Sequence, residues 1–154
     1  MISRPTTQQL LDAICVELGS KVAPAISDPV VQIQLEMAIA VLKTTAARSG
    51  SELAWMQEER DSIEQAAREL LDAMPDATAL RDALTTYTDG MTNSLYLNDA
   101  QADYARASEV LSCAIEAAYA SGNAEHIATV IGLMDQRHAH QQEVTGQFMA
   151  AGRA

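Results

Sequence analysis

A helical repeat of apolar residues runs through almost the whole chain, and this feature most constrains its fold. Apolar side chains recur every three or four residues, as at Leu10, Ile14 and Leu18. Residues at that spacing line one face of an α-helix, whereas a half-buried strand alternates every second residue, a pattern that is nearly absent here. The sequence therefore predicts an all-α protein in which each helix buries an apolar face against its neighbours.

Residues that start or end helices divide this pattern into five to six helices. The starts are at Thr6, Asp28, Ser51, Asp76 or Thr78, Asn98 or Asp99, and Asn123, and the ends are near Pro24, Gly50, Pro75 and Gly122. Short connections favour antiparallel neighbours, so we expect a bundle that forms a single domain over 1–154. Its front half is 4–75 and its back half 76–150. The apolar residues of 29–49 cover more than one face, which predicts a central, most buried helix.

The two cysteines, Cys15 and Cys113, lie far apart in the sequence, and each is embedded in an apolar helical pattern. Neither belongs to a C-x-x-C pair, and a chain of 154 residues can bury a core without a disulfide. We expect both to be reduced, buried, small apolar side chains, with a redox or nucleophilic role as the alternative.

The chain is acidic, with 21 Asp and Glu against 10 Lys and Arg and a net charge of −11 at pH 7. Such a surface repels phosphate backbones and anionic lipids, so we expect no nucleic-acid partner and no membrane partner. The first 13 residues lack the pattern of a secretory signal, and the longest apolar run is interrupted by Gln32, Gln34 and Glu36. These features predict a cytoplasmic location.

Two of the three histidines lie in the segment DQRHAHQQE, residues 135–143, and the third is His126. A helix turns by about 100° per residue, so His138 and His140 point about 160° apart and cannot hold one metal ion together. Asp135 and His138 are one turn apart and could form half of a helical two-metal site, but no second such pair exists in the chain. We therefore predict no metal and no cofactor. Asp135 and His138 are kept as candidates for an acid/base pair.

Helical counting also predicts how deeply each histidine is buried. His138 falls on the edge of the expected buried face, as a half-buried or interface residue, whereas His140 and His126 are expected to be solvated. That expected buried face consists of Ile127, Ile131 and Met134.

The charged residues of 58–69 have helical spacing and alternate in sign. Glu58, Glu59, Asp61, Glu64 and Glu69 are interleaved with Arg60 and Arg68. This predicts a solvated helix face, with a cation site as the alternative. Trp55, one turn into the helix that is predicted to start at Ser51, is expected to pack in the bundle or to anchor a partner.

Recognisable enzyme motifs are absent from the sequence. It contains no phosphate-binding G-x-x-x-x-G-K-S/T loop, no G-x-G-x-x-G, no G-x-S-x-G and no H-E-x-x-H. This favours a non-catalytic protein, with an enzyme as the alternative.

The opening RPTTQQLLDAICVEL, the apolar segment QIQLEMAIAVLKTTAARSG and the later AARELL resemble an uncharacterised bacterial all-helical family. The resemblance covers residues 4–75. Members of that family are found beside, or fused to, aminoglycoside-phosphotransferase-like kinases and acyl-CoA dehydrogenases. The resemblance implies a helical accessory domain whose partner carries out the chemistry, and it implies no catalytic residues.

Two hypotheses follow for function. The first is a non-catalytic interaction module or accessory subunit, which is expected to be a homo-oligomer or to bind a kinase-like or acyl-CoA-processing enzyme. The second is a small enzyme or ligand-binding bundle with a pocket near His138 and Asp135, and with Tyr104 or Tyr119 close by. The interface candidates for the first hypothesis are Leu80, Leu84, Tyr87, Met91, Trp55 and His138.

Overall fold

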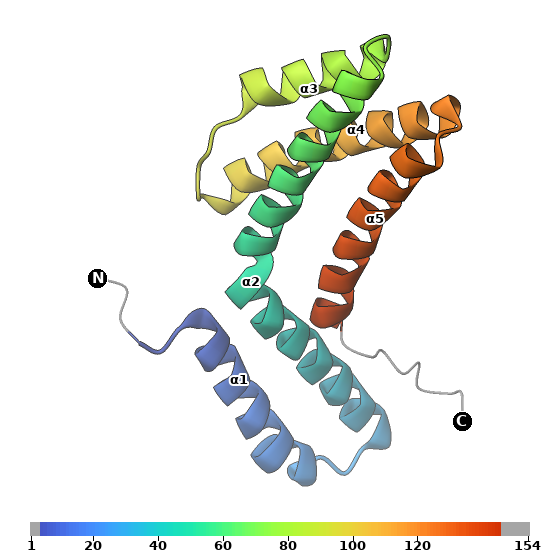
Figure 1. Cartoon of the computed structure of the whole chain (residues 1–154). Coiled ribbons are helices and arrows are strands. Elements are labelled where there is room, and N and C mark those ends of the chain that lie inside the picture. The colour runs from blue at the N-terminus through green and yellow to red at the C-terminus, as the bar shows by residue number, and fades with distance from the viewer. Residues whose placement is uncertain (1–3, 146–154) are drawn as a thin grey trace. The chain divides into compact units, whose positions relative to one another are not determined.

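The computed structural model describes residues 4–145 and confirms the all-α class (Figure 1). Within these residues there are five α-helices and no strand. A π-helical turn at Leu18–Val22 and a 3-10 turn at Ala23–Ala25 follow the first helix. The helices are α1 at Thr7–Glu17, α2 at Pro29–Ala73, α3 at Thr78–Gly90, α4 at Leu97–Ser121 and α5 at Ala124–Thr145.

The described residues fall into two compact units. One unit contains the residues up to Glu52 together with those after His140, and the other is Leu53–His140. The sequence predicts one domain with halves that meet at residue 75, whereas this division lies inside α2.

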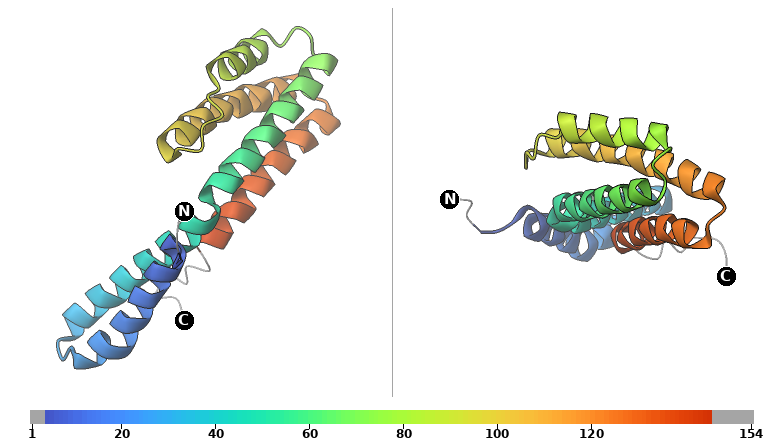
Figure 2. Two further views of the ribbon diagram at one scale, coloured as in Figure 1. Left: turned by 90° about the vertical axis from the view of Figure 1, so that its left-hand side faces the viewer. Right: turned by 45° about the horizontal axis from the view of Figure 1, so that its top comes forward.

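The first unit contains a helical hairpin, in which α1 runs alongside the first part of α2 (Figures 1 and 2). The predicted capping box starts α1, because Gln9 N donates to Thr6 Oγ1 at 3.2 Å and Thr6 N donates to Gln9 Oε1 at 2.9 Å. Cys15 is buried and its Sγ lies 3.9 Å from the carbonyl oxygen of Ile39. Cys15 and Ala46 are the buried side chains of this unit among those described.

The prediction of a central, most buried helix at 29–49 is wrong. Within its unit this stretch packs against α1 through one face, and the remaining apolar side chains stay exposed. Val30, Ile33, Met37 and Val41, spaced by three or four residues, form one such exposed stripe. The helix also continues through Gly50 instead of ending there. A Cβ at Gly50 would lie 2.8 Å from Gln8 Oε1, so the glycine allows close approach of the α1 side chain.

By length and composition, α2 also contains a stretch apolar enough to cross a membrane, and 6% of that stretch is buried. The sequence predicts no such run, because Gln32, Gln34 and Glu36 interrupt it. The three polar residues lower the hydropathy of the stretch without bringing it below that of a possible span.

The second unit has one apolar core, built from the second part of α2 and from α3, α4 and α5. Leu80, Leu84 and Tyr87 lie inside it and Met91 packs against it, so the structure uses these four interface candidates in the intramolecular core. Burial of each such side chain contributes about 1.5–3 kcal/mol. The other core residues are Ile63, Ala67, Leu70, Ala107, Val110, Leu111, Ala114, Ala118 and Val130.

Local signals end α4 and start α5 as predicted. Gly122 follows α4 with φ of 64°, a left-handed conformation that glycine adopts without strain. The side chain of Asn123 then caps α5, because Glu125 N donates to Asn123 Oδ1 at 2.9 Å.

Candidate functional site

The most developed polar site of the second unit surrounds Glu59 on α2, whose side chain is 7% exposed. Tyr104 Oη donates to Glu59 Oε2 at 2.5 Å, and Arg137 Nε donates to the same oxygen at 3.2 Å. His140 Nδ1 lies 2.7 Å from Glu59 Oε1. One buried carboxylate thereby joins α2, α4 and α5.

Aromatic contacts hold the groups around this carboxylate in place. The Trp55 indole stacks on the His140 ring, with centroids 5.0 Å apart and planes 11° apart. The Arg137 guanidinium lies 4.9 Å from the centre of the Tyr104 ring, and its Nη2 donates to Ser108 Oγ at 3.0 Å. Trp55 therefore packs inside its own unit against α5.

The electrostatics favour an ionised Glu59. Burial by itself raises the pKa of this carboxyl, but the hydrogen bonds from Tyr104, His140 and Arg137 together lower it below its usual value. Burial and the hydrogen bond to Glu59 raise the pKa of Tyr104 to about 12. A carboxylate with a lowered pKa and occupied oxygens is a weak general base, so the geometry favours a bracing role over proton transfer.

A second buried carboxylate, Asp103 on α4, is 0% exposed and fastens the loop that follows α3. It accepts hydrogen bonds from Thr92 N at 3.2 Å, from Thr92 Oγ1 at 2.9 Å and from Arg106 Nη2. Burial raises the pKa of Asp103, and these bonds from Thr92 and Arg106 lower it by more, so it lies below its usual value. Arg60 Nη1 reaches the same carboxylate at 3.4 Å.

The structure reverses the predicted burial of the two neighbouring histidines. His138 and Asp135 are exposed, whereas the side chain of His140 is 15% exposed and contacts Glu59 and Trp55. His126 is half-buried and lies 3.1 Å from Ser121 Oγ through its Nδ1. The expected acid/base pair therefore lies on the surface, and the histidine that enters the site, His140, is the one predicted to be solvated.

The physical reason is the rotational phase of α5. Ile131 and Met134, which the sequence pattern assigns to the inward face, are exposed. The inward face instead follows Val130, Leu133, Arg137 and His140, spaced by three or four residues. A buried stripe that ends in two polar residues, here Arg137 and His140, is hard to recognise from the sequence. Their burial depends on the Glu59 carboxylate of another helix.

The sequence pattern likewise places the charged residues of 58–69 on a solvated face of α2. This is wrong for Glu59 and Arg60, which are buried. A signal for this burial exists in the sequence, because Glu59 lies on the same helical face as the core residues Ile63, Ala67 and Leu70. Arg68 keeps the expected role, with its Nη2 2.6 Å from Glu64 Oε1 on the same helix.

Other reactive groups give little support to chemistry at this site. Over the described part of the chain, no three side chains of His, Cys, Asp or Glu are placed to hold a metal ion. Both cysteines are free, as predicted, but Cys113 is half-buried instead of buried as expected. Burial, then Glu109 and Glu116, raise the pKa of the Cys113 thiol, which makes it a poorer nucleophile.

The first unit carries a different kind of candidate site, an exposed apolar surface that we call the hairpin surface. Its stripe on α2 includes Met37, which is 66% exposed. From Pro29 to Leu42 the sequence holds a single charged residue, Glu36. The hairpin surface is this stripe, formed by Val30, Ile33, Met37 and Val41; further exposed apolar side chains of the unit, on other helix faces, are Leu10, Ile14, Val16, Val22 and Val31.

Comparisons with known proteins do not assign a function to either candidate site, because no family model, no curated protein and no solved structure matches the chain.

Proposed function

We propose that this protein is a non-catalytic helical interaction module that forms a homodimer through the hairpin surface. The observation that carries the proposal is the imbalance within the first unit, where many large apolar side chains are exposed and few are buried. The polar site around Glu59 supports the non-catalytic part, because its acceptors and donors are engaged with one another.

An isolated pair of helices gains little stability, because helices in proteins are held mainly by packing of their apolar faces. The exposed apolar side chains of the hairpin surface would each contribute about 1 kcal/mol if a partner covered their remaining area. A contact with several of them thus supplies the kind of apolar centre that specific interfaces have.

A second copy of the chain is the occupant that fits this surface best. An isologous interface needs a surface that complements itself, and a weakly charged apolar helix face meets its own copy without like-charge repulsion. Two hairpins joined in this way would form a four-helix arrangement. The net charge of −11 disfavours an anionic lipid surface as the alternative occupant of the same stripe.

The resemblance of residues 4–75 to the bacterial all-helical family described above supports an accessory role for this dimer. In that role it would bind a kinase-like or acyl-CoA-processing enzyme, which would carry out the reaction. Recovery of such an enzyme with tagged protein from its native cells would support this part, and recovery of the tagged protein without one would count against it.

For the second hypothesis, a ligand-binding bundle, the support comes from a cavity that is distinct from the predicted pocket near His138 and Asp135. Asp135 and His138 are exposed on α5, whereas a cavity lies beside Arg60 of α2.

Light scattering on the size-exclusion eluate tests the dimer, with vesicle flotation as the competing arm. We expect twice the chain mass at micromolar concentration and no flotation with neutral or anionic vesicles. A monomer at every concentration would overturn the proposal, and flotation of a monomeric protein would assign the hairpin surface to a membrane instead.

A further inference from the structure

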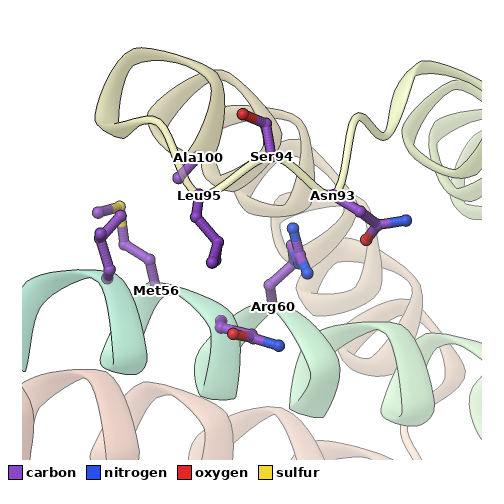
Figure 3. Close-up of a pocket in the computed structure, with 8 residues that line it drawn as sticks. Met56, Arg60, Asn93, Ser94, Leu95 and Ala100 are labelled. Carbon is purple, nitrogen blue, oxygen red and sulfur yellow. The ribbon is translucent and has the colours of Figure 1, made fainter. Parts of the chain in front are cut away.

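A small cavity in the second unit lies between α2, the loop 91–96 and the start of α4 (Figure 3). Its volume is about 110 Å³. Because a water molecule takes about 30 Å³ of liquid, the space corresponds to about four water molecules and suits a small ligand. The lining residues are Leu53, Met56, Gln57, Arg60, Asn93, Ser94, Leu95 and Ala100.

Arg60 is the charged side chain in this lining, and it is 10% exposed. Its hydrogen bonding is incomplete: Nη1 makes one long contact of 3.4 Å with Asp103, and Nε is buried without a hydrogen-bond partner. The nearest acid to Nε is Asp61, at 3.7 Å, on a largely exposed side chain. A buried guanidinium with unused donors is costly, and an anionic ligand would reduce that cost.

The protein's own carboxylate does not complete the pairing of Arg60. Asp103 already accepts hydrogen bonds from Thr92 and Arg106, and the two arginines share this one buried acid. Asp61, on an exposed side chain, is the other acid near Arg60, so the buried part of the guanidinium has one shared carboxylate as its partner.

The rest of the wall is mixed, with polar side chains from Gln57, Asn93 and Ser94 and apolar ones from Leu53, Met56, Leu95 and Ala100. Figure 3 shows the Leu95 side chain between those of Met56 and Arg60, with Asn93 and Ser94 on the loop above. Leu95 is 75% exposed, so a ligand seated in the cavity would cover part of an apolar side chain that is otherwise in water. One cationic fork with an apolar patch on one side suits a carboxylate with a small aliphatic tail, and the polar side chains lie within reach of the carboxylate end.

We propose that this cavity binds a short-chain monocarboxylate, with the carboxylate on the guanidinium of Arg60 and the tail against Met56, Leu95 and Ala100. The site is independent of the hairpin surface, because all of its residues belong to the second unit.

Methyl NMR titration of the full chain with butyrate tests this site, and isosteric butyramide tests the need for charge. For so small a ligand we expect a dissociation constant of about 1 mM and saturable shifts of the Leu95, Met56 and Ala100 methyls. Butyramide should bind at least tenfold more weakly, and n-butylammonium at matched ionic strength should produce no saturable shifts. Absence of saturation with butyrate, or equal binding of butyramide, would overturn the proposal.

Variants locate the site. Ala100→Leu fills the cavity without removing charge and should weaken butyrate binding at least tenfold, and Arg60→Lys, which loses the planar fork, at least fivefold. Leu95→Ala, at an exposed loop position, should weaken it severalfold and serves if the other two variants fail to fold. Arg68→Gln, an exposed arginine on the same helix, should bind like the wild type. Wild-type affinity in all three cavity variants would contradict the assignment.

Discussion

The His140 ring and the Glu59 carboxylate lie 81 residues apart in the sequence and 2.7 Å apart in space, between Nδ1 and Oε1. This contact and the neighbouring bond from Arg137 attach α5 to α2. Because Glu59 is buried, each donor removed from it leaves a charge less compensated, which makes the network a sensitive determinant of stability.

Glu59→Gln should lower the free energy of unfolding by about 2–4 kcal/mol, since it removes the acceptor charge shared by Arg137, Tyr104 and His140. Urea denaturation followed by circular dichroism measures the loss. Asp72→Asn is the matched control, because Asp72 is an exposed carboxylate of the same helix. A loss as small as that of the control would show that the network contributes little.

Tyr104→Phe should cost about 1–2 kcal/mol, because it deletes the hydroxyl that donates to Glu59 and keeps the ring. Tyr119→Phe, at an exposed tyrosine of the same helix, should leave stability within about 0.5 kcal/mol of the wild type. A double-mutant cycle with Glu59→Gln should show a coupling energy above about 0.5 kcal/mol. Strict additivity would mean that the bond has no energetic role.

Stability should fall in acid through Glu59 and Asp103. The pKa of each carboxyl is lower in the folded protein than in the unfolded chain. Their contribution is therefore fully present above the unfolded value near 4 and is lost as pH falls through the lowered folded values. Urea titrations from neutral pH to about pH 3 measure this slope. Glu59→Gln should flatten it, and an unchanged slope in that variant would remove Glu59 from the explanation.

Two glycines should respond to alanine in opposite directions. Gly132 lies inside α5, and a Cβ added there would meet no neighbouring atom within 4 Å, so Gly132→Ala should stabilise by about 0.5–1 kcal/mol. Gly122 has φ of 64°, so Gly122→Ala should destabilise by about 1 kcal/mol. Thermal melts of the two variants measure the sign of each change in stability. A change of the same sign in both variants would contradict the end of α4 assigned to Gly122.

Local signals make the helix class and several helix ends predictable. The Thr6 capping box, the left-handed Gly122 and the Asn123 cap each depend on residues within one turn, so the sequence suffices to place them. Gly50 shows the limit of this reasoning, because a glycine can serve close approach of another helix, here at Gln8, as well as a helix end.

The polar site is less predictable, because its contacts join distant parts of the chain. His140 is buried by Trp55 and Glu59, which come from another helix and do not appear in the helical pattern of α5. Leu80, Leu84 and Tyr87 show the reverse problem: an apolar stripe looks the same whether its partner is α4 or another protein.

The central claim, dimerisation through the hairpin surface, is tested most directly by sedimentation equilibrium of Met37→Lys beside its matched control Met134→Lys. Both methionines lie on exposed helix faces, Met37 at 66% in the first unit and Met134 at 45% in the second. A lysine in the apolar interface should raise the dimer dissociation constant at least tenfold for Met37→Lys, while Met134→Lys should associate like the wild type. Equal association of the wild type and both variants, or a wild type that is monomeric throughout, would contradict it.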